Sequence, residues 1–156
     1  MFLYDESSIL LVDGYLSNSK ILYASPNFSF IFSFIKKELL NLNLDELIPA
    51  PIQSFHKELI ENAIKYSNNN KFNYIFNNKK DSLIKNKLGD INQIKLFVKP
   101  APNLSYGLIY YNYIQKFYEN NYIILLDEDF KIHGISEINN FFSFFNINNE
   151  ISSAII

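Results

Sequence analysis

The side chains that could carry chemistry in this chain are few and lie far apart. Neither His56 nor His133 has a second histidine, a cysteine or a pair of carboxylates at the spacing that a metal site needs. The acidic run 127–129 is followed by Lys131 and Ile132, where a calcium loop requires an oxygen ligand and then a glycine. We therefore interpret His133 as a structural or surface residue and the acidic run as a solvated hairpin tip, with no metal bound.

No other residue pattern points to catalysis. The chain has no cysteine, which excludes disulfides, thiolate metal sites and a cysteinyl nucleophile. No serine lies in a Gly-x-Ser-x-Gly sequence, and the four glycines form neither a P-loop nor a dinucleotide fingerprint. The sequence therefore predicts a protein that is not an enzyme.

Charge and composition exclude two further classes of partner. All fourteen basic residues are lysines and the formal net charge is −2, so no basic stripe or arginine fork is present for nucleic acid. The longest uncharged stretches, 21–35 and 100–115, contain proline, asparagine, serine or glycine and are too short to span a membrane. The acidic start MFLYDESS is unlike a signal peptide. We expect a soluble, cytoplasmic domain, on the intracellular side if the parent protein is membrane-bound.

The elements that must position these side chains are five strands interrupted by helices. Two apolar runs joined by a turn predict a hairpin, and three further runs follow the helical segment. The expected strands are Ile9–Asp13, Lys20–Ala24, Ser82–Lys87, Ile91–Lys99 and Tyr106–Gln115. The last two are separated by a break at Pro100–Asn103, and a tight turn lies at Leu88–Asp90. This order predicts an α+β fold, an antiparallel sheet with helices packed on one face.

The clearest helix begins at Pro51 and runs for about fourteen residues, since its apolar residues recur every three or four positions. This periodicity predicts buried side chains at Ile52, Phe55, Leu59, Ile60 and Ala63. It predicts exposed side chains at Lys57, Glu58 and Glu61. Shorter helices are expected at Phe28–Ile35, after Pro26, and around Leu44–Ile48, while a helical turn around Phe72–Phe76 is one interpretation of the Asn68–Lys80 loop.

The segment 21–64 resembles the PAS family. The run ILYASPNFSFIFSF, followed by KKELLNLNLDELIPAPIQSFHKELIENAI, is similar to the strand, Asn-bearing helix and Pro-x-x-x-x-His helix of PAS domains. Matching positions are Asn27, Leu39, Asn43, Leu47, Pro49 and His56. LGDINQIKLFVKP resembles a PAS strand turn with Gly-Asp in place of the usual Asp-Gly. The resemblance covers residues 8–117 and implies a five-stranded sheet in the order 2-1-5-4-3. It is closest to PAS segments of oxygen-sensing histidine kinases and of ciliate multi-pass membrane proteins, and the asparagine, lysine and isoleucine bias suits the second, protist group.

The resemblance also bears on cofactors. In haem-binding relatives the ligand histidine lies about a dozen residues beyond the position of His56, where this chain has Asn68–Asn70. The missing cysteine excludes the covalent flavin chemistry of light-sensing relatives. We therefore expect no cofactor, and we interpret the family-motif residues Asn27, Pro49 and His56 as structural.

Two functions from different classes remain open. The first is a non-catalytic interaction module that relays a signal or docks within a larger protein or assembly, binding a protein partner or other domains of the same polypeptide. The second is a small-molecule sensor that holds an apolar ligand in the PAS cavity. The cluster Phe28, Phe30, Phe32 and Phe34 fits both, as packed core or as cavity lining.

The tail 121–156 echoes the start of the chain. Ile123–Asp127 resembles Ile9–Asp13, and the next stretch parallels an earlier one at a constant offset of 111 residues. The parallel residues are Lys131, Ile132, Ser136, Phe141 and Phe145 with Lys20, Ile21, Ser25, Phe30 and Phe34. The tail is thus either the beginning of a second PAS-like unit or part of the first core.

Overall fold

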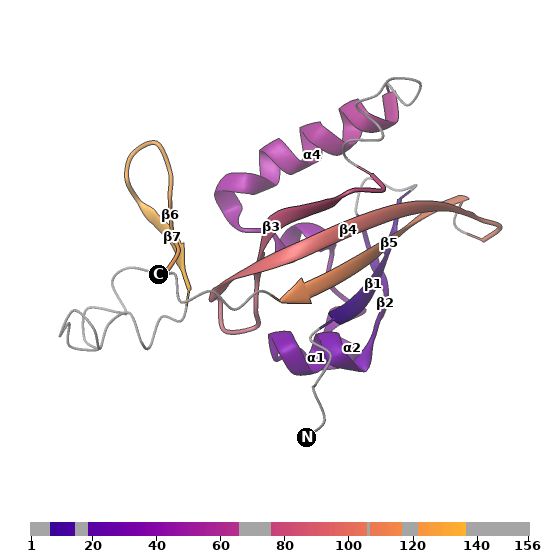
Figure 1. Ribbon diagram of the computed structural model, residues 1–156, viewed down its shortest axis with the longest axis horizontal. Coiled ribbons are helices and arrows are strands. Elements are labelled where there is room, and N and C mark those ends of the chain that lie inside the picture. The colour runs from indigo at the N-terminus through magenta and orange to yellow at the C-terminus, as the bar shows by residue number, and fades with distance from the viewer. Residues whose placement is uncertain (1–6, 15–18, 66–75, 106, 117–121, 137–156) are drawn as a thin grey trace.

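A five-stranded antiparallel sheet in the order β2-β1-β5-β4-β3 forms the centre of the molecule (Figure 1). The computed structural model describes residues 7–14, 19–65, 76–105, 107–116 and 122–136. The strands of this sheet are β1 (Ser7–Asp13), β2 (Ile21–Ala24), β3 (Lys79–Lys85), β4 (Ile91–Asn103) and β5 (Gly107–Lys116). The predicted fold class and strand order are confirmed, because β1 pairs along its whole length with β5, from Ser7 opposite Gln115 to Asp13 opposite Ile109.

The sheet continues through the prolines at which the sequence predicts a break. β4 pairs with β5 as far as Asn103, and β3 pairs with β4 only as far as Phe97. The carbonyl of Val98 accepts a bond from the Asn77 amide on the side away from β5, so Pro100 and Pro102 turn their missing N–H groups toward that same side. Proline is tolerated on such an edge because no ladder hydrogen bond is lost there.

Helices cover the face of the sheet on which alternate residues of each strand are apolar. The first three are α1 (Pro26–Phe32), α2 (Lys36–Leu39) and α3 (Leu44–Leu47). Phe28 and Phe32 of α1 are fully buried in one core with the inward-facing residues of the strands, and their rings lie 4.7 Å apart. The core consists of Leu10, Val12, Ile21, Ala24, Phe28, Phe32, Leu39, Leu47, Phe76, Ile84, Ile94, Val98, Tyr110 and Ile114.

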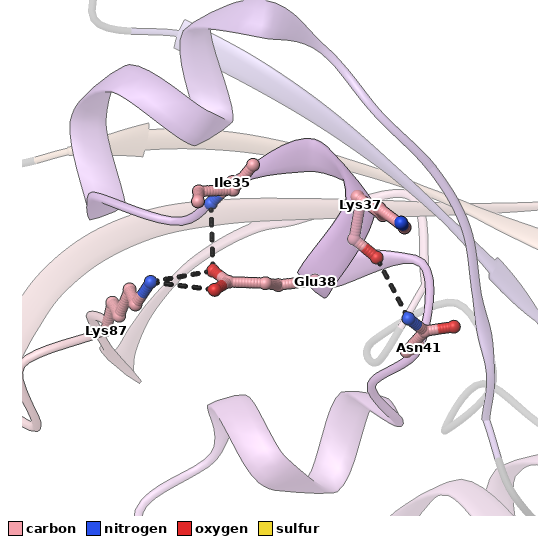
Figure 2. Close-up of polar contacts among 5 residues, drawn as sticks. All are labelled: Ile35, Lys37, Glu38, Asn41 and Lys87. Atoms are coloured by element: carbon pink, nitrogen blue, oxygen red, sulfur yellow. Dashed lines mark hydrogen bonds and ion pairs between the residues drawn. The ribbon is translucent and has the colours of Figure 1, made fainter.

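A polar clamp joins these short helices to the turn between β3 and β4. Both carboxylate oxygens of Glu38 lie 2.8 Å from Lys87 Nζ, and one of them also accepts a bond from the Ile35 amide (Figure 2). The Lys87 amide in turn donates to the carbonyl of Phe32. These bonds lower the pKa of Glu38, the lysine ammonium being the main cause. α2, which the sequence did not predict, is thereby tied at its start to a turn about fifty positions away.

The predicted tight turn between β3 and β4 is confirmed. Asn86 closes it by accepting bonds from the Leu88 and Asp90 amides, both at 2.9 Å, and Gly89 takes a positive φ of 90°. Glycine adopts this backbone conformation without strain.

The long helix α4 (Ala50–Lys65) is confirmed as a helix, but its predicted apolar face is not a packed one. Phe55 is 63% exposed, so its predicted burial is wrong, and Ile52, Leu59 and Ile60 are only half-buried. Lys57, Glu58 and Glu61 are exposed as predicted, and the side chain of Ala63 lies outside the described part. The reason is that this face of α4 borders a hollow instead of pressing against the sheet.

A separate two-stranded hairpin, β6 (Ile124–Leu126) and β7 (Ile132–Ile135), lies beside the main sheet (Figure 1). Its tip, from Asp127 to Phe130, is a solvated turn as predicted, with exposed Glu128 and Asp129. The helical turn considered at Phe72–Phe76 falls mainly outside the described residues, and so do Phe141 and Phe145 of the sequence repeat.

Candidate functional site: a cavity between α4 and the sheet

A hollow with a volume of about 380 Å³ separates α4 from the inner face of the sheet. This volume is within the range of small-molecule sites. Its lining is mainly apolar, from α4 on one side and from β3, β4 and β5 on the other. The apolar lining residues are Leu10, Leu44, Leu47, Ile48, Ile52, Phe55, Leu59, Ile60, Phe76, Leu83, Ile84, Ile94, Leu96, Val98 and Ile114.

His56 contributes the polar group on the helix side. It lies one turn into α4, and its Nδ1 atom is 4.0 Å from Oδ1 of Asp45 on α3. Burial lowers the pKa of the imidazole; Asp45 opposes this shift and the nearby Lys80 ammonium adds to it. The ring is therefore mainly neutral at pH 7 and can both donate and accept a hydrogen bond at the cavity wall.

Lys80 approaches the same space from the sheet side. It lies on β3 opposite Leu96, and burial lowers the pKa of its ammonium group. An ammonium that is partly removed from water gains more from an anionic or strongly accepting neighbour than a surface lysine does. His56 and Lys80 together form a basic corner in an otherwise apolar cavity.

Asn112, on β5, contributes a fixed amide to the floor. Its Nδ2 donates to the carbonyls of Leu10 and Tyr110, at 3.2 and 3.3 Å, and the side chain is buried. Because these bonds use both amide hydrogens, the Oδ1 oxygen remains as an acceptor for a molecule in the cavity.

Tyr110 closes one end of the floor with a ring that is held in place. The ring stacks on Phe76 with centroids 5.3 Å apart and planes 8° apart. A methyl group built at Gly14 would lie 2.7 Å from Cε2 of the ring. Within the described residues the buried hydroxyl has no hydrogen-bond partner, and burial raises the pKa of the phenol.

The family-motif residues lie at different places in the fold. Asn27, at the start of α1, donates to the carbonyl of Ser7 at 3.2 Å and so joins the helix to β1. Pro49 is buried between α3 and α4. His56 alone of the three lines the cavity. A structural role for the three residues remains a prediction.

The phenylalanine cluster does not line the cavity. Phe28 and Phe32 are core residues, Phe34 stacks on Phe28 at 6.4 Å, and Phe30 is 76% exposed. Three further residues line the cavity that no pattern in the sequence predicted, namely Lys80, Asn112 and Tyr110. Their alternation with outward-facing neighbours placed them on one face of their strands, but only the folded sheet brings that face opposite His56.

Other kinds of site lack support in the part of the chain that the structure describes. There, no three histidine, aspartate or glutamate side chains gather as they would to hold a metal ion. His133 pairs instead with Asp127 across the hairpin, at 2.6 Å between Nε2 and Oδ2. None of the described helices is both long enough and apolar enough to cross a membrane.

Solved structures with this arrangement of sheet and helices are numerous. The PAS domain of the fruit-fly ELK potassium channel matches 76% of this chain over 92% of its own length, with a TM-score of 0.52 and 15% identity. A PAS domain from Desulfitobacterium hafniense matches 72% of the chain over 93% of its own, with a TM-score of 0.56 and 12% identity. The chain has the PAS fold. A PAS domain from a two-component sensor histidine kinase is similar as well, with a TM-score of 0.50, 10% identity and coverage of 73% and 87%.

At the level of sequence alone no such neighbour is found. No protein-family model matches the chain, and no curated protein sequence matches it. Identities of this size show the fold and leave the ligand and the partner to be argued from this chain's own residues.

Proposed function

We propose that this chain is a non-catalytic PAS module of a larger protein or assembly, and that its input is a small, largely apolar molecule held between α4 and the sheet. The observation that supports this proposal is the cavity itself, since α4 leaves about 380 Å³ unfilled where a packed core would bury Ile52, Leu59 and Ile60. The hollow is partly open to solvent, and it leaves apolar side chains uncovered that a close-packed contact between helix and sheet would cover.

The polar groups of the cavity indicate how a ligand would be oriented between α4 and the sheet. A carboxylate or another accepting group would pair with the ammonium of Lys80 and accept a hydrogen bond from His56. A donor elsewhere on the molecule would meet Oδ1 of Asn112. The remaining walls are apolar, so most of the ligand would be hydrocarbon or aromatic.

Native mass spectrometry of protein purified without detergent tests this proposal. We expect a mass above that of the 156 residues, which is lost in the variant Leu59→Trp, because the indole would fill the cavity. The matched control is Leu88→Trp, in which the same side chain replaces a leucine that is 76% exposed on the β3–β4 turn.

Titration with the apolar fluorophore N-phenyl-1-naphthylamine provides the second reading. The wild type and the Leu88→Trp control should bind it with equal affinity, and Leu59→Trp should bind at least about tenfold more weakly. Equal binding by all three proteins, with no copurified mass, would show that the cavity holds no ligand.

A second candidate is a docking module without a ligand, and the outer face of the sheet favours it. The aromatic pair Phe97 and Tyr113, with centroids 5.8 Å apart, lies in a shallow groove of about 370 Å³ together with Ile9 and Lys95. Such exposed aromatic surface rimmed by polar residues is typical of protein contacts. A Tyr113→Lys variant that keeps ligand binding but loses its partner would support this function instead.

The more specific expectations rest on sequence resemblance alone. These are the likeness to oxygen-sensing kinases and to ciliate membrane proteins, and the absence of haem and covalent flavin; the expected cytoplasmic location rests on the charge pattern and the short uncharged stretches. An absorbance spectrum with a Soret or flavin band would contradict the expectation about cofactors.

A further inference from the structure

The hairpin β6–β7 repeats the geometry of the hairpin β1–β2. In each pair the register shifts by one residue after the second paired position, between Leu11 and Val12 in the first and between Leu125 and Leu126 in the second. The paired residues are Leu10–Ala24, Leu11–Tyr23 and Val12–Ile21 in the first hairpin, and Ile124–Ile135, Leu125–Gly134 and Leu126–Ile132 in the second. A bulge at the same place sets the same bend and twist in both hairpins.

At the open end of each hairpin, a serine at the equivalent position holds the two strands together. Ser25 Oγ accepts a bond from the Ile9 amide at 3.0 Å, and the Ser25 amide donates to the Ile9 carbonyl at 2.9 Å. Ser136 Oγ accepts from the Ile123 amide at 2.8 Å, and the Ser136 amide donates to the Ile123 carbonyl at 2.9 Å. This reciprocal pair of bonds matches atom for atom.

The closed ends match too. The Asp13 amide donates to the Lys20 carbonyl at 2.9 Å, and the Asp127 amide donates to the Lys131 carbonyl at 3.1 Å. The connecting turn is three residues shorter in the second hairpin. The first strands of the two hairpins are therefore 114 residues apart in the sequence, and the second strands are 111 residues apart. The similarity between the start and the tail of the sequence is therefore also a similarity of structure.

The two hairpins differ in what covers them. Leu10 and Val12 are completely buried beneath the helices, whereas their counterparts Ile124 and Leu126 are 43% and 42% exposed. On the same face Ile135 is buried, so the uncovered part is β6. The other edge of β1 is paired with β5, whereas within the described residues β6 pairs with β7 alone.

The opposite face of the second hairpin packs against the first unit, by which we mean the five-stranded sheet and its helices. A methyl group built at Gly134 would lie 2.5 Å from two side-chain atoms of Ile91, at the start of β4. Gly134 holds the place of Tyr23, whose side chain points away from the core of the first unit. The hairpin thus places its outward face against the first unit and leaves Ile124 and Leu126 available.

We propose that β6–β7 is the opening hairpin of a second PAS-like unit, and that the edge and exposed face of β6 bind the strand that plays the part of β5 in that unit. The expected occupant is an antiparallel strand in the register in which β5 meets β1, with apolar side chains on the face of Ile124 and Leu126. This proposal does not depend on a ligand in the cavity.

Amide hydrogen exchange on the 156-residue chain is the first test. The amides of Leu10 and Val12 point toward β5, because those of the odd-numbered Ile9 and Asp13 bond to the β2 side. We expect exchange at Ile124 and Leu126 to be at least about a hundredfold faster than at Leu10 and Val12, since the edge of β6 is unpaired within the described residues. Equal protection in the monomeric chain would overturn the proposal.

Sedimentation separates this occupant from a second copy of the chain. If β6 edges of two molecules pair with each other, the chain is a dimer that the double variant Ile124→Lys/Leu126→Lys dissociates, and the proposal is wrong. We expect the sedimentation coefficient to depend on protein concentration in the same way for the wild type and for the double variant.

Supplying the missing strand is the decisive test. Because Ser136 holds the place of Ser25, residues 1–136 can be followed directly by a second copy of residues 26–116. We expect Ile124 and Leu126 to become as protected as Leu10 and Val12, and the unfolding enthalpy to increase by a factor of about 1.8 with the second folded unit.

Two variants keep this test informative. The same spliced chain with Ile124→Lys/Leu126→Lys should fold only its first unit. A spliced chain with Ile135→Ala restores the residue that the first hairpin has at Ala24, in case isoleucine overfills the new core. Unprotected Ile124 and Leu126 amides in both the original and the Ile135→Ala spliced chains would refute the proposal.

Discussion

Replacing Tyr110 by phenylalanine should stabilise this protein. The hydroxyl is buried without a hydrogen-bond partner among the described residues. The ring is held in place because it stacks on Phe76 and lies so near Gly14 that an added methyl group there would be 2.7 Å from it. Desolvating an unpaired hydroxyl costs about 1–3 kcal/mol. The void left by removing one oxygen costs a few tenths of a kcal/mol at about 24 cal/mol per Å³.

The net gain in the free energy of unfolding is therefore about 1–2 kcal/mol. For a chain of this length each kcal/mol raises the melting temperature by about 2–4 °C. Urea and thermal unfolding followed by circular dichroism measure both quantities. The matched control is Tyr113→Phe on the outer face, where the side chain is 42% exposed and the change should stay within about 0.5 kcal/mol.

A loss of stability in Tyr110→Phe would refute this reasoning. It would mean that the hydroxyl donates to a partner, such as a water or a ligand bound beside it. Extraction of the protein with organic solvent would then distinguish a ligand from a water. If the partner is a bound ligand, extraction removes it, and the difference in stability between the wild type and Tyr110→Phe disappears.

Three further perturbations test other parts of the structure. Gly14→Ala should cost about 1–3 kcal/mol in urea unfolding, because its new methyl group would meet the Tyr110 ring at 2.7 Å and the ring has no room to retreat. The fold should lose stability as pH falls through about 6.5, since burial holds the pKa of His56 below its ordinary value and the unfolded chain binds the proton first. His56→Gln should flatten that dependence between about pH 7.5 and 5.5, and an unchanged slope would assign it to other groups. Removing residues 121–156 should leave all five strands folded and lower the melting temperature by no more than about 4 °C, because Ile91 loses its cover; an unfolded remainder would show that the tail completes the first core.

The order of strands and helices could be predicted from the sequence because it depends on local patterns. Alternation along Ile94, Leu96 and Val98 identifies the inward face of β4, and the Leu88–Asp90 segment identifies a tight turn, whatever lies nearby. The serines of the two hairpins are likewise visible in the sequence at an offset of 111 residues, and the aspartates at an offset of 114 residues. The same dependence on local patterns explains why the predicted break at Pro100 is wrong. Proline breaks a strand only where its missing amide is needed, and the edge position is a property of the assembled sheet.

The candidate site was decided by the tertiary structure. Helical periodicity shows that Ile52, Phe55 and Leu59 share one face of α4, but it does not show how closely that face approaches the sheet. That distance is a property of the folded chain, in which α4 and the sheet leave the cavity between them. Lys80 and Asn112 are distant from His56 along the chain, and no local pattern marks them. They become polar groups of one site because strand pairing in the order 2-1-5-4-3 brings β3 and β5 beneath the same helix.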